Sequence, residues 1–223
     1  MADDNFGVGK RASELAKEII QKGLSEDLMW FTQVRCDDII KHQDALPKLR
    51  KSGLRWILLG VENSNQSTLE TFRKNITPED AKKAVKLLKK NDIFAQAMFI
   101  IGERKDTAES IAESRKFIDE LDSDFVIFAI LTPFLGTELF EEAKKNGWIE
   151  DSNWANYDMV HLIMPTETLS RKEVQEELYK CYRSFYGSWK RRLQGSFSRN
   201  ELKRRVYWHM LSRGILKQLR GLF

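Results

Sequence analysis

The stretch FAQAMFII (Phe94–Ile101), then GERKDTAESIAESRKFIDEL, then FVIFAILT (Phe125–Thr132) decides the fold of this chain. Each apolar run has the length of a strand and lacks polar alternation, which is typical of strands covered on both faces. The residues between them keep helical spacing and predict a helix over Thr107–Leu121, with Asp106 and Glu109 as its capping pair. Two buried strands that are joined through a helix run parallel, with a right-handed crossover.

The same alternation extends towards the amino end of the chain. The predicted elements are the end of a strand at Ala2–Phe6, a helix over Lys10–Lys22, a strand over Leu28–Arg35, a helix over Asp38–Ser52 that Pro47 breaks or restarts, a strand over Arg55–Val61, and helices over Gln66–Phe72 and Pro78–Asn91. A strand–helix repeat of roughly 30 residues without a reversal halfway predicts an α/β fold, a partial (β/α) barrel of parallel strands. A doubly wound sheet is the alternative.

Three parts follow from the pattern of the 223 residues. We expect the partial barrel over residues 1–146, an irregular segment with a helix packed on the barrel over residues 147–186, and a basic amphipathic helical tail over residues 187–223. Ser170 and Glu173 form a capping pair for the helix of the middle part, which runs to about Tyr186. Thr137 is explained as the cap of a helix that opens after Gly136.

The cysteines and the hydropathy indicate the compartment. Cys36 and Cys181 lie far apart, so their spacing predicts neither a disulfide framework nor a metal site. No apolar run approaches the roughly 20 residues that span a bilayer. We therefore expect a cytoplasmic protein, and we interpret Cys36 as a small buried residue.

The carboxyl-terminal tail differs in charge from the rest of the chain. From Arg183 onwards there are 11 Lys and Arg residues against one acidic residue, Glu201, while the preceding residues are net acidic. Ser198 and Glu201 predict the cap of a last helix, which either packs its Leu and Ile residues on the barrel or lies on an anionic membrane surface. The membrane interpretation rests on Trp208, Leu211, Ile215 and Leu219 among the basic residues. Nucleic-acid binding is not expected, because no recognition motif accompanies the charge.

Polar residues follow the predicted strands, at the end where parallel barrels place their functional side chains. Glu62 is the most informative of them, because an acid directly after an apolar strand is costly unless it has a partner. The whole set is Asp3, Asp4, Asn5, Gln33, Arg35, Glu62, Asn63, Ser64, Gly102, Glu103, Thr132, Pro133 and Thr137.

Six short runs, in order, resemble the radical S-adenosylmethionine superfamily. They are DDNF, FTQVR, LLGVENSNQSTL, MFIIGERKDT, ILTPFLGTEL and WANYD, and together they extend over residues 2–186. More narrowly, they resemble the branch whose members usually carry a cobalamin-binding domain, which includes anaerobic magnesium-protoporphyrin ester cyclases and lipid methylases. The resemblance implies a (β/α) barrel with S-adenosylmethionine as cofactor.

The resemblance also implies roles for single residues. Asp4 matches the acid that meets the amino group of S-adenosylmethionine, and Glu62 with Ser64 matches the polar pair after the ribose-side strand. Gly102 matches the glycine that lets the backbone approach the adenosyl group. Leu131 to Pro133 match the strand end that flanks the adenine. Arg35 is a weaker candidate to bind the carboxylate of S-adenosylmethionine.

This sequence also departs from the family pattern. It contains no CxxxCxxC loop for a [4Fe-4S] cluster and no cobalamin domain, and its GxPGET turn reads GERKDT. We therefore expect a fragment of a radical enzyme of the cobalamin-dependent type, which transfers a methyl group to an apolar substrate or cyclises it oxidatively. Such a fragment is inactive alone, and its partner is the missing amino-terminal barrel and cluster segment.

Two origins of such a chain stay open. The first is that it is a piece of a longer enzyme, either because only part of the gene was expressed or because the gene is split. The second is that it is a natural remnant with a binding role. The alternative function is a non-enzymatic, basic-tailed interaction module at a membrane surface or on a partner protein, which would make the chain peripheral to the membrane.

Overall fold

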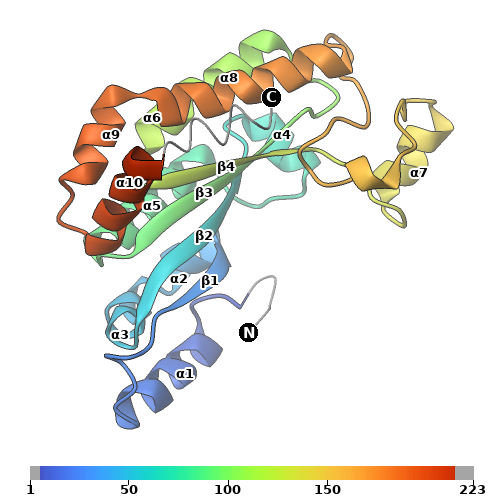
Figure 1. The fold of residues 1–223 in the computed structure, drawn as a ribbon. Helices are drawn as coiled ribbons and strands as arrows, with labels where there is room; N and C mark the ends of the chain where they lie inside the picture. Colours follow the sequence, from blue (N-terminus) through green and yellow to red (C-terminus); the bar gives the residue numbers. More distant parts are fainter. Residues whose placement is uncertain (1–5, 214–223) are drawn as a thin grey trace.

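Four parallel strands form the sheet at the centre of the structure, a computed structural model that describes residues 6–213 (Figure 1). The strands pair in chain order and are β1 (Trp30–Arg35), β2 (Leu54–Glu62), β3 (Phe94–Ile101) and β4 (Phe125–Ile130). This order confirms the partial barrel rather than the doubly wound alternative, in which the strand order reverses. The predicted strand end at Ala2–Phe6 lies outside the described residues except for Phe6, which is not in a strand.

The helices that precede β1 and connect the strands cover one face of the sheet. They are α1 (Lys10–Gln21), α2 (Cys36–Lys41), the short 3-10 helix η1 (Gln43–Ala45), α3 (Leu46–Lys51), α4 (Gln66–Thr71), α5 (Pro78–Lys90) and α6 (Ala108–Leu121). The covered face carries the core, with Ile57, Leu59 and Phe99 almost completely buried. Pro47 lies in the first turn of α3, so it restarts the helix there as predicted.

The cap of α6 is not the predicted one. Thr107 and Ser110 form the capping box, and Asp106 with Glu109 does not. The reason is that the Asp106 carboxylate turns back to the loop after β3, where it accepts hydrogen bonds from the N–H groups of Gly102 (2.9 Å) and Glu103 (3.1 Å). A buried carboxylate that satisfies two backbone donors of a loop is not free to cap a helix.

The opposite face of the sheet is only partly covered, which differs from the expectation of strands buried on both faces. Gln33 is exposed, and Leu58, Met98 and Ile127 are half-buried. The register places Gln33, Leu58 and Gln96 side by side on this face. The described strands thus form part of a barrel wall whose inner surface stays accessible.

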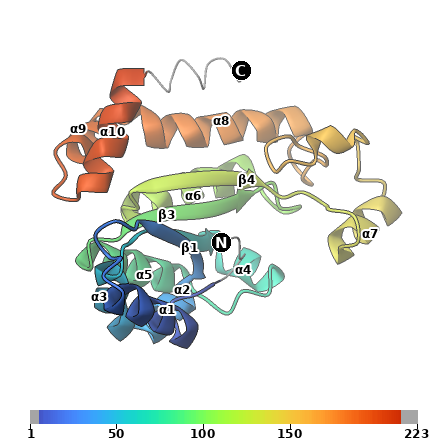
Figure 2. The same cartoon turned by 60° about the horizontal axis from the view of Figure 1, so that its bottom comes forward.

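A long helix covers the free edge of β4. Helix α8 (Arg171–Gly187) runs along this strand in both views (Figures 1 and 2). The Tyr186 hydroxyl accepts a hydrogen bond from the Val126 N–H (3.1 Å) and donates one to the Val126 carbonyl (2.6 Å). Tyr182 bonds Phe128 in the same way, at 3.2 and 3.0 Å. The edge groups of Val126 and Phe128 are therefore satisfied by side chains instead of by a further strand, and the Ile130 N–H donates to the Met159 carbonyl.

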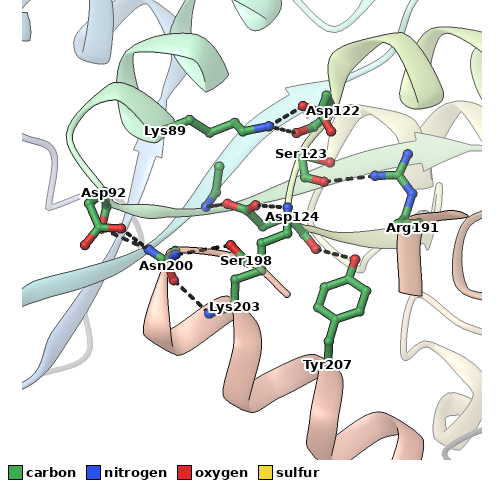
Figure 3. Close-up of polar contacts among 11 residues, drawn as sticks. Lys89, Asp92, Asp122, Ser123, Asp124, Arg191, Ser198, Asn200, Lys203 and Tyr207 are labelled. Carbon is green, nitrogen blue, oxygen red and sulfur yellow. Dashed lines mark hydrogen bonds and ion pairs between the residues drawn. The ribbon is translucent and has the colours of Figure 1, made fainter. Parts of the chain in front are cut away.

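The described part of the basic tail packs at the amino ends of the strands. Helices α9 (Trp189–Ser196) and α10 (Glu201–Arg213) lie there, and Figure 3 shows their polar contacts. The Lys203 ammonium lies 2.6 Å from the Asp124 carboxylate, and the Tyr207 hydroxyl donates to the Asp124 carbonyl at 3.0 Å. Leu211, one of the Leu and Ile residues that the packing interpretation placed on the barrel, is exposed instead.

Two details of the tail differ from the sequence predictions. Asn200, and not Ser198, caps the first turn of α10. The Asn200 side-chain oxygen accepts a hydrogen bond from the Lys203 N–H at 2.7 Å. The tail from residue 187 was predicted to be helical, but α9 was not predicted as a separate helix with its own bounds. Ile215 and Leu219, on which part of the membrane interpretation rests, lie outside the described residues.

The segment after β4 extends away from the sheet. It holds α7 (Glu138–Lys145), capped by Thr137 as predicted, and the short 3-10 helix η2 (Trp154–Asn156). Figure 1 shows α7 beyond the carboxyl end of β4. Among residues 6–213 no helix combines the length and the apolarity needed to cross a membrane.

Candidate functional site

The parallel sheet brings the predicted site residues to one edge. Arg35 is the last residue of β1 and Glu62 the last of β2, while Gly102 directly follows β3 and Leu131 directly follows β4. The carboxyl ends of parallel strands meet at the same rim, so these residues share it. Asp4 lies outside the described residues.

Glu62 is the unusual residue of this rim. Its backbone is in the left-handed region at φ +68°, where the pairing of β2 with β3 shifts register between Gly60 and Glu62. A non-glycine residue there costs on the order of 1 to 3 kcal/mol. The side chain is 5% exposed, and its Oε1 accepts from the Lys74 ammonium at 2.9 Å. Its Oε2 is buried and has no hydrogen-bond partner among residues 6–213, so this acceptor of Glu62 is not satisfied by the described part of the chain.

Lys74 is the functional residue that the sequence reasoning missed. It follows α4 and reaches back to Glu62 across 12 positions of the chain. The sequence did signal that Glu62 needs a partner, but many lysines could have supplied it. Gly60 completes the arrangement, because a Cβ at that position would lie 2.8 Å from Glu62 Oε1.

A cavity of about 240 Å³ lies over the open face of the sheet at this rim. Its lining residues are Gln33, Val34, Arg35, Leu58, Gly60, Glu62, Lys74 and Met98. Arg35 forms a two-pronged pair with Asp37, at 2.9 and 3.2 Å. The hydrogen bonds to Asp37 raise the pKa of Arg35. Burial acts to raise the pKa of Asp37, but the Arg35 guanidinium has the opposite and larger effect, so the pKa of Asp37 is lowered. One acid and two cations therefore surround a cavity with apolar walls.

The polar residues after Glu62 hold the loop instead of lining the cavity. The Ser64 hydroxyl lies 2.8 Å from the Ser114 hydroxyl of α6. The Asn63 amide donates to the Ile100 carbonyl at 3.2 Å and accepts from the Asn65 N–H at 2.9 Å. The structure thus brings Glu62 and Arg35 together at the cavity and turns Ser64 towards the covered side of the sheet.

The loop after β3 is shaped by Gly102 and Asp106. Gly102 has φ +82°, which is accessible to glycine at little cost. A Cβ there would meet Val174 at 3.5 Å and Ile130 at 3.9 Å, so the missing side chain faces protein. Burial raises the pKa of Asp106, against the lowering effect of its hydrogen bonds from Ser110 and the loop.

The strand end after β4 holds the last two predicted site residues. The Leu131 N–H donates to the Ile101 carbonyl at 2.9 Å, so the pairing with β3 continues one residue beyond the strand. Pro133 is buried, and the chain then turns outward towards α7.

The cysteines do not provide a cluster site. Cys36 is fully buried, as predicted, and its thiol lies 3.3 Å from the Gly60 carbonyl. Burial, together with the charge of Glu62, raises the pKa of the Cys36 thiol; burial raises that of Cys181 to about 11. Within residues 6–213 no three His, Cys, Asp or Glu side chains gather in a way that could hold a metal ion. A [4Fe-4S] cluster needs thiolate ligands, so the residues present do not fit one.

Comparison with known proteins gives matches along most of the chain. The model of the Radical SAM superfamily matches residues 3–118. The anaerobic magnesium-protoporphyrin IX monomethyl ester cyclase of Cereibacter sphaeroides is 32% identical over 79% of this chain and 29% of its own. The bacteriochlorophyllide d C-8(2)-methyltransferase of Chlorobaculum tepidum is 26% identical over 85% of this chain and 42% of its own. The chain thus spans less than half the length of these curated relatives.

A solved structure supports the fold. The radical S-adenosylmethionine methyltransferase TsrM of Kitasatospora setae, with cobalamin and a [4Fe-4S] cluster bound, superimposes with a TM-score of 0.51. The match has 18% sequence identity and covers 64% of this chain and 27% of that one.

Proposed function

Because this chain belongs to the radical SAM superfamily, we propose that it supplies the S-adenosylmethionine-binding part of a cobalamin-type enzyme that methylates or oxidatively cyclises an apolar substrate. Enzymes of this superfamily use S-adenosylmethionine and a [4Fe-4S] cluster, and the branch matched here contains cyclases and methyltransferases.

The observation that carries the proposal is that Glu62, which lines the cavity, has a buried Oε2 with no hydrogen-bond partner among the described residues. S-adenosylmethionine offers an ammonium group and ribose hydroxyls, which are donors that suit this acceptor. Its carboxylate suits Lys74 and the cationic Arg35, which line the same cavity. Bound beside a reduced cluster, S-adenosylmethionine supplies radical chemistry. The residues of this chain bind and orient it.

The cluster ligands and the cobalamin site are proposed to come from a segment that is not in this sequence. The support is chemical: the sequence has two cysteines, and the structure buries both of them. Anaerobic reconstitution of this chain with iron and sulfide is expected to give no stoichiometric cluster. A cluster that forms and is lost in Cys36→Ser would contradict this part of the proposal.

The apolar character of the substrate is supported by the segment after β4. Five large apolar side chains are exposed there, on the side of the carboxyl rim, and they are Phe134, Leu135, Trp154, Met159 and Val160. Exposed apolar side chains at the same end of the sheet as the cavity suit a substrate that is mostly hydrocarbon or aromatic.

Equilibrium dialysis with labelled S-adenosylmethionine tests the binding role. Glu62→Gln removes the charge of the acceptor and keeps its shape, so we expect affinity to fall by roughly ten- to a hundredfold, the range for hydrogen bonds to charged groups. Glu177→Gln is the matched control, because Glu177 is a buried glutamate paired with Arg115 and Lys180 that does not line the cavity. Equal affinities of wild type and Glu62→Gln, with all three proteins folded by circular dichroism, would contradict the proposal.

The second candidate function is an interaction module that lies peripherally at a membrane. The observation that favours it is the exposure of large apolar side chains on α9 and α10, among basic residues. It is compatible with the first proposal, since these side chains and the cavity lie at opposite ends of the sheet.

A further inference from the structure

We infer that the outer faces of α9 and α10 form a docking surface for an anionic lipid bilayer, located at the end of the sheet opposite to the cofactor cavity. The surface consists of Trp189, Leu193, Phe197, Trp208 and Leu211 with the basic residues around them. The inference makes the peripheral location specific, and it does not depend on S-adenosylmethionine binding.

The inner faces of both helices are already occupied. Tyr207 is 2% exposed and packs against Gly195 of α9, while its hydroxyl reaches the Asp124 carbonyl. Lys203 and Arg191 pair with Asp124 and Asp119 of the α6–β4 region, at 2.6 and 3.2 Å. Figure 3 shows Arg191, Lys203 and Tyr207 converging on the residues just before β4. The two helices are therefore fixed on the sheet without any help from their outer faces.

The outer faces carry large apolar side chains where a helix covering a sheet would have polar ones. Trp189, Leu193 and Phe197 recur every fourth residue of the α9 region and are 70%, 53% and 77% exposed. On α10, Trp208 is 53% exposed and donates from its indole N–H to the Ser196 carbonyl at the end of α9, at 3.1 Å. This bond places the Trp208 indole against the peptide that joins Ser196 to Phe197, which brings the exposed side chains of the two helices close together. Leu211 extends this surface by one turn.

The charge around this surface favours lipid over protein as its occupant. Lys190, Arg199, Arg204 and Arg205 are exposed on the same two helices and their connection. Over residues 188–211 the single acidic residue is Glu201, which pairs with Arg205 at 3.0 Å. Tryptophan and phenylalanine amid arginine and lysine are the composition of helices that lie in the headgroup region of anionic membranes. A protein partner would more often meet an apolar surface that is poor in lysine.

The placement has a geometric consequence. Helices α9 and α10 lie at the amino ends of β3 and β4, whereas Glu62 and Arg35 lie at the carboxyl ends (Figure 1). A chain that lies on a bilayer through α9 and α10 keeps its cofactor cavity turned away from the lipid. Vesicle binding and cofactor binding can therefore be lost independently of each other.

Co-sedimentation of the full chain with vesicles of equal parts phosphatidylglycerol and phosphatidylcholine tests the inference at low salt. We expect the wild type to bind these vesicles, to bind pure phosphatidylcholine much less, and to dissociate as salt rises. Trp189→Ser combined with Phe197→Ser is expected to lower the partition about tenfold or more, because both rings lose their burial in lipid. The matched control combines Leu135→Ser with Trp154→Ser, two large apolar side chains that are 69% and 57% exposed at the other end of the molecule.

A second pair of variants separates charge from apolar burial. The double variant Lys190→Glu with Arg204→Glu is expected to weaken binding to the anionic vesicles. Its control is Lys83→Glu with Lys86→Glu, two exposed lysines of α5. The control changes the net charge equally and is expected to leave binding near the wild-type value. Wild-type chain that stays in the supernatant, or loss of binding in both charge pairs alike, overturns the inference. So does a dimer in size-exclusion chromatography that Phe197→Ser dissociates without any vesicle binding, since this would assign the surface to a second copy of the chain.

Discussion

Replacing Asp124 by asparagine tests whether an ion pair holds the carboxyl-terminal helices on the sheet. The Asp124 and Lys203 side chains are only 7% and 12% exposed, and their charged atoms lie 2.6 Å apart. The second Asp124 oxygen accepts from the Ala95 N–H at 2.9 Å, a bond that asparagine can keep through its carbonyl oxygen. The substitution therefore keeps the bond to Ala95 and places an amide NH2 group where a carboxylate oxygen faced Lys203. The Lys203 ammonium loses both its counter-ion and a hydrogen-bond acceptor (Figure 3).

Removing one partner of a buried ion pair costs about 3 to 5 kcal/mol. Lys203 has a flexible chain and slight access to water, so we expect the lower end of that range, about 3 kcal/mol. For a chain of this size that corresponds to a fall in Tm of about 6 to 12 °C. Lys203→Met buries an apolar group instead of an ammonium, so the double variant Asp124→Asn with Lys203→Met is expected to recover part of the loss.

Urea denaturation followed by circular dichroism measures both single variants and the double variant, which closes a double-mutant cycle. We expect a coupling energy of about 1 to 3 kcal/mol between the two sites. The control cycle uses Lys82→Met and Glu120→Gln, an ion pair at 3.0 Å with 33% and 65% exposed side chains, where about 0 to 1 kcal/mol is expected. Coupling at Asp124 no larger than in this control would refute the reasoning.

Two further predictions concern the way α8 and α9 pack. Tyr186→Phe leaves the N–H and carbonyl of Val126 without a partner at the β4 edge, so we expect a loss of about 2 kcal/mol in urea denaturation. Burial holds the pKa of Tyr186 well above 10.0 in the folded protein, so the neutral hydroxyl stabilises the fold below pH 10.0 and this stabilisation is lost as the pH rises further. We therefore expect the free energy of unfolding to fall less steeply with alkaline pH in Tyr186→Phe than in the wild type. Equal slopes would contradict this. Gly195→Ala forces a methyl group into the Tyr207 ring, so we expect the free energy of unfolding to fall by about 1 to 3 kcal/mol. Gly187→Ala is the control, because the space around Gly187 is open and the change should be nearly neutral. Similar Tm values for the two variants would contradict the packing of α9 on α10.

Much of the fold follows from local pattern. The strand over Phe94–Ile101 was predicted with its observed bounds, because a long apolar run between turn signals has few alternative structures. The helices with a proline or a Ser/Thr cap at their start were predicted to within one or two residues, since these residues act on the first turn alone. The order of strands in the sheet also followed, because parallel strands with helical connections leave few topologies.

The predictions failed where several residues compete for the same partner. Asp106 has the sequence signature of a helix cap, yet the loop after β3 needs its carboxylate more. Ser198 precedes α10 as a cap would, but Asn200 lies closer to the first free N–H groups. Which of two suitable side chains wins depends on distances that are set by the packed structure.

The sequence by itself determined the parallel α/β wall, the rim at which its polar residues gather, and the family resemblance, because these depend on residue order and spacing along one chain. Only the tertiary structure decided that Lys74 is the partner of Glu62, that the edge of β4 is covered by two tyrosines, and that the outer faces of α9 and α10 stay exposed. Each of these depends on which of many chemically equivalent side chains comes within about 3 Å of another, and hydrogen bonds and ion pairs act only over that range.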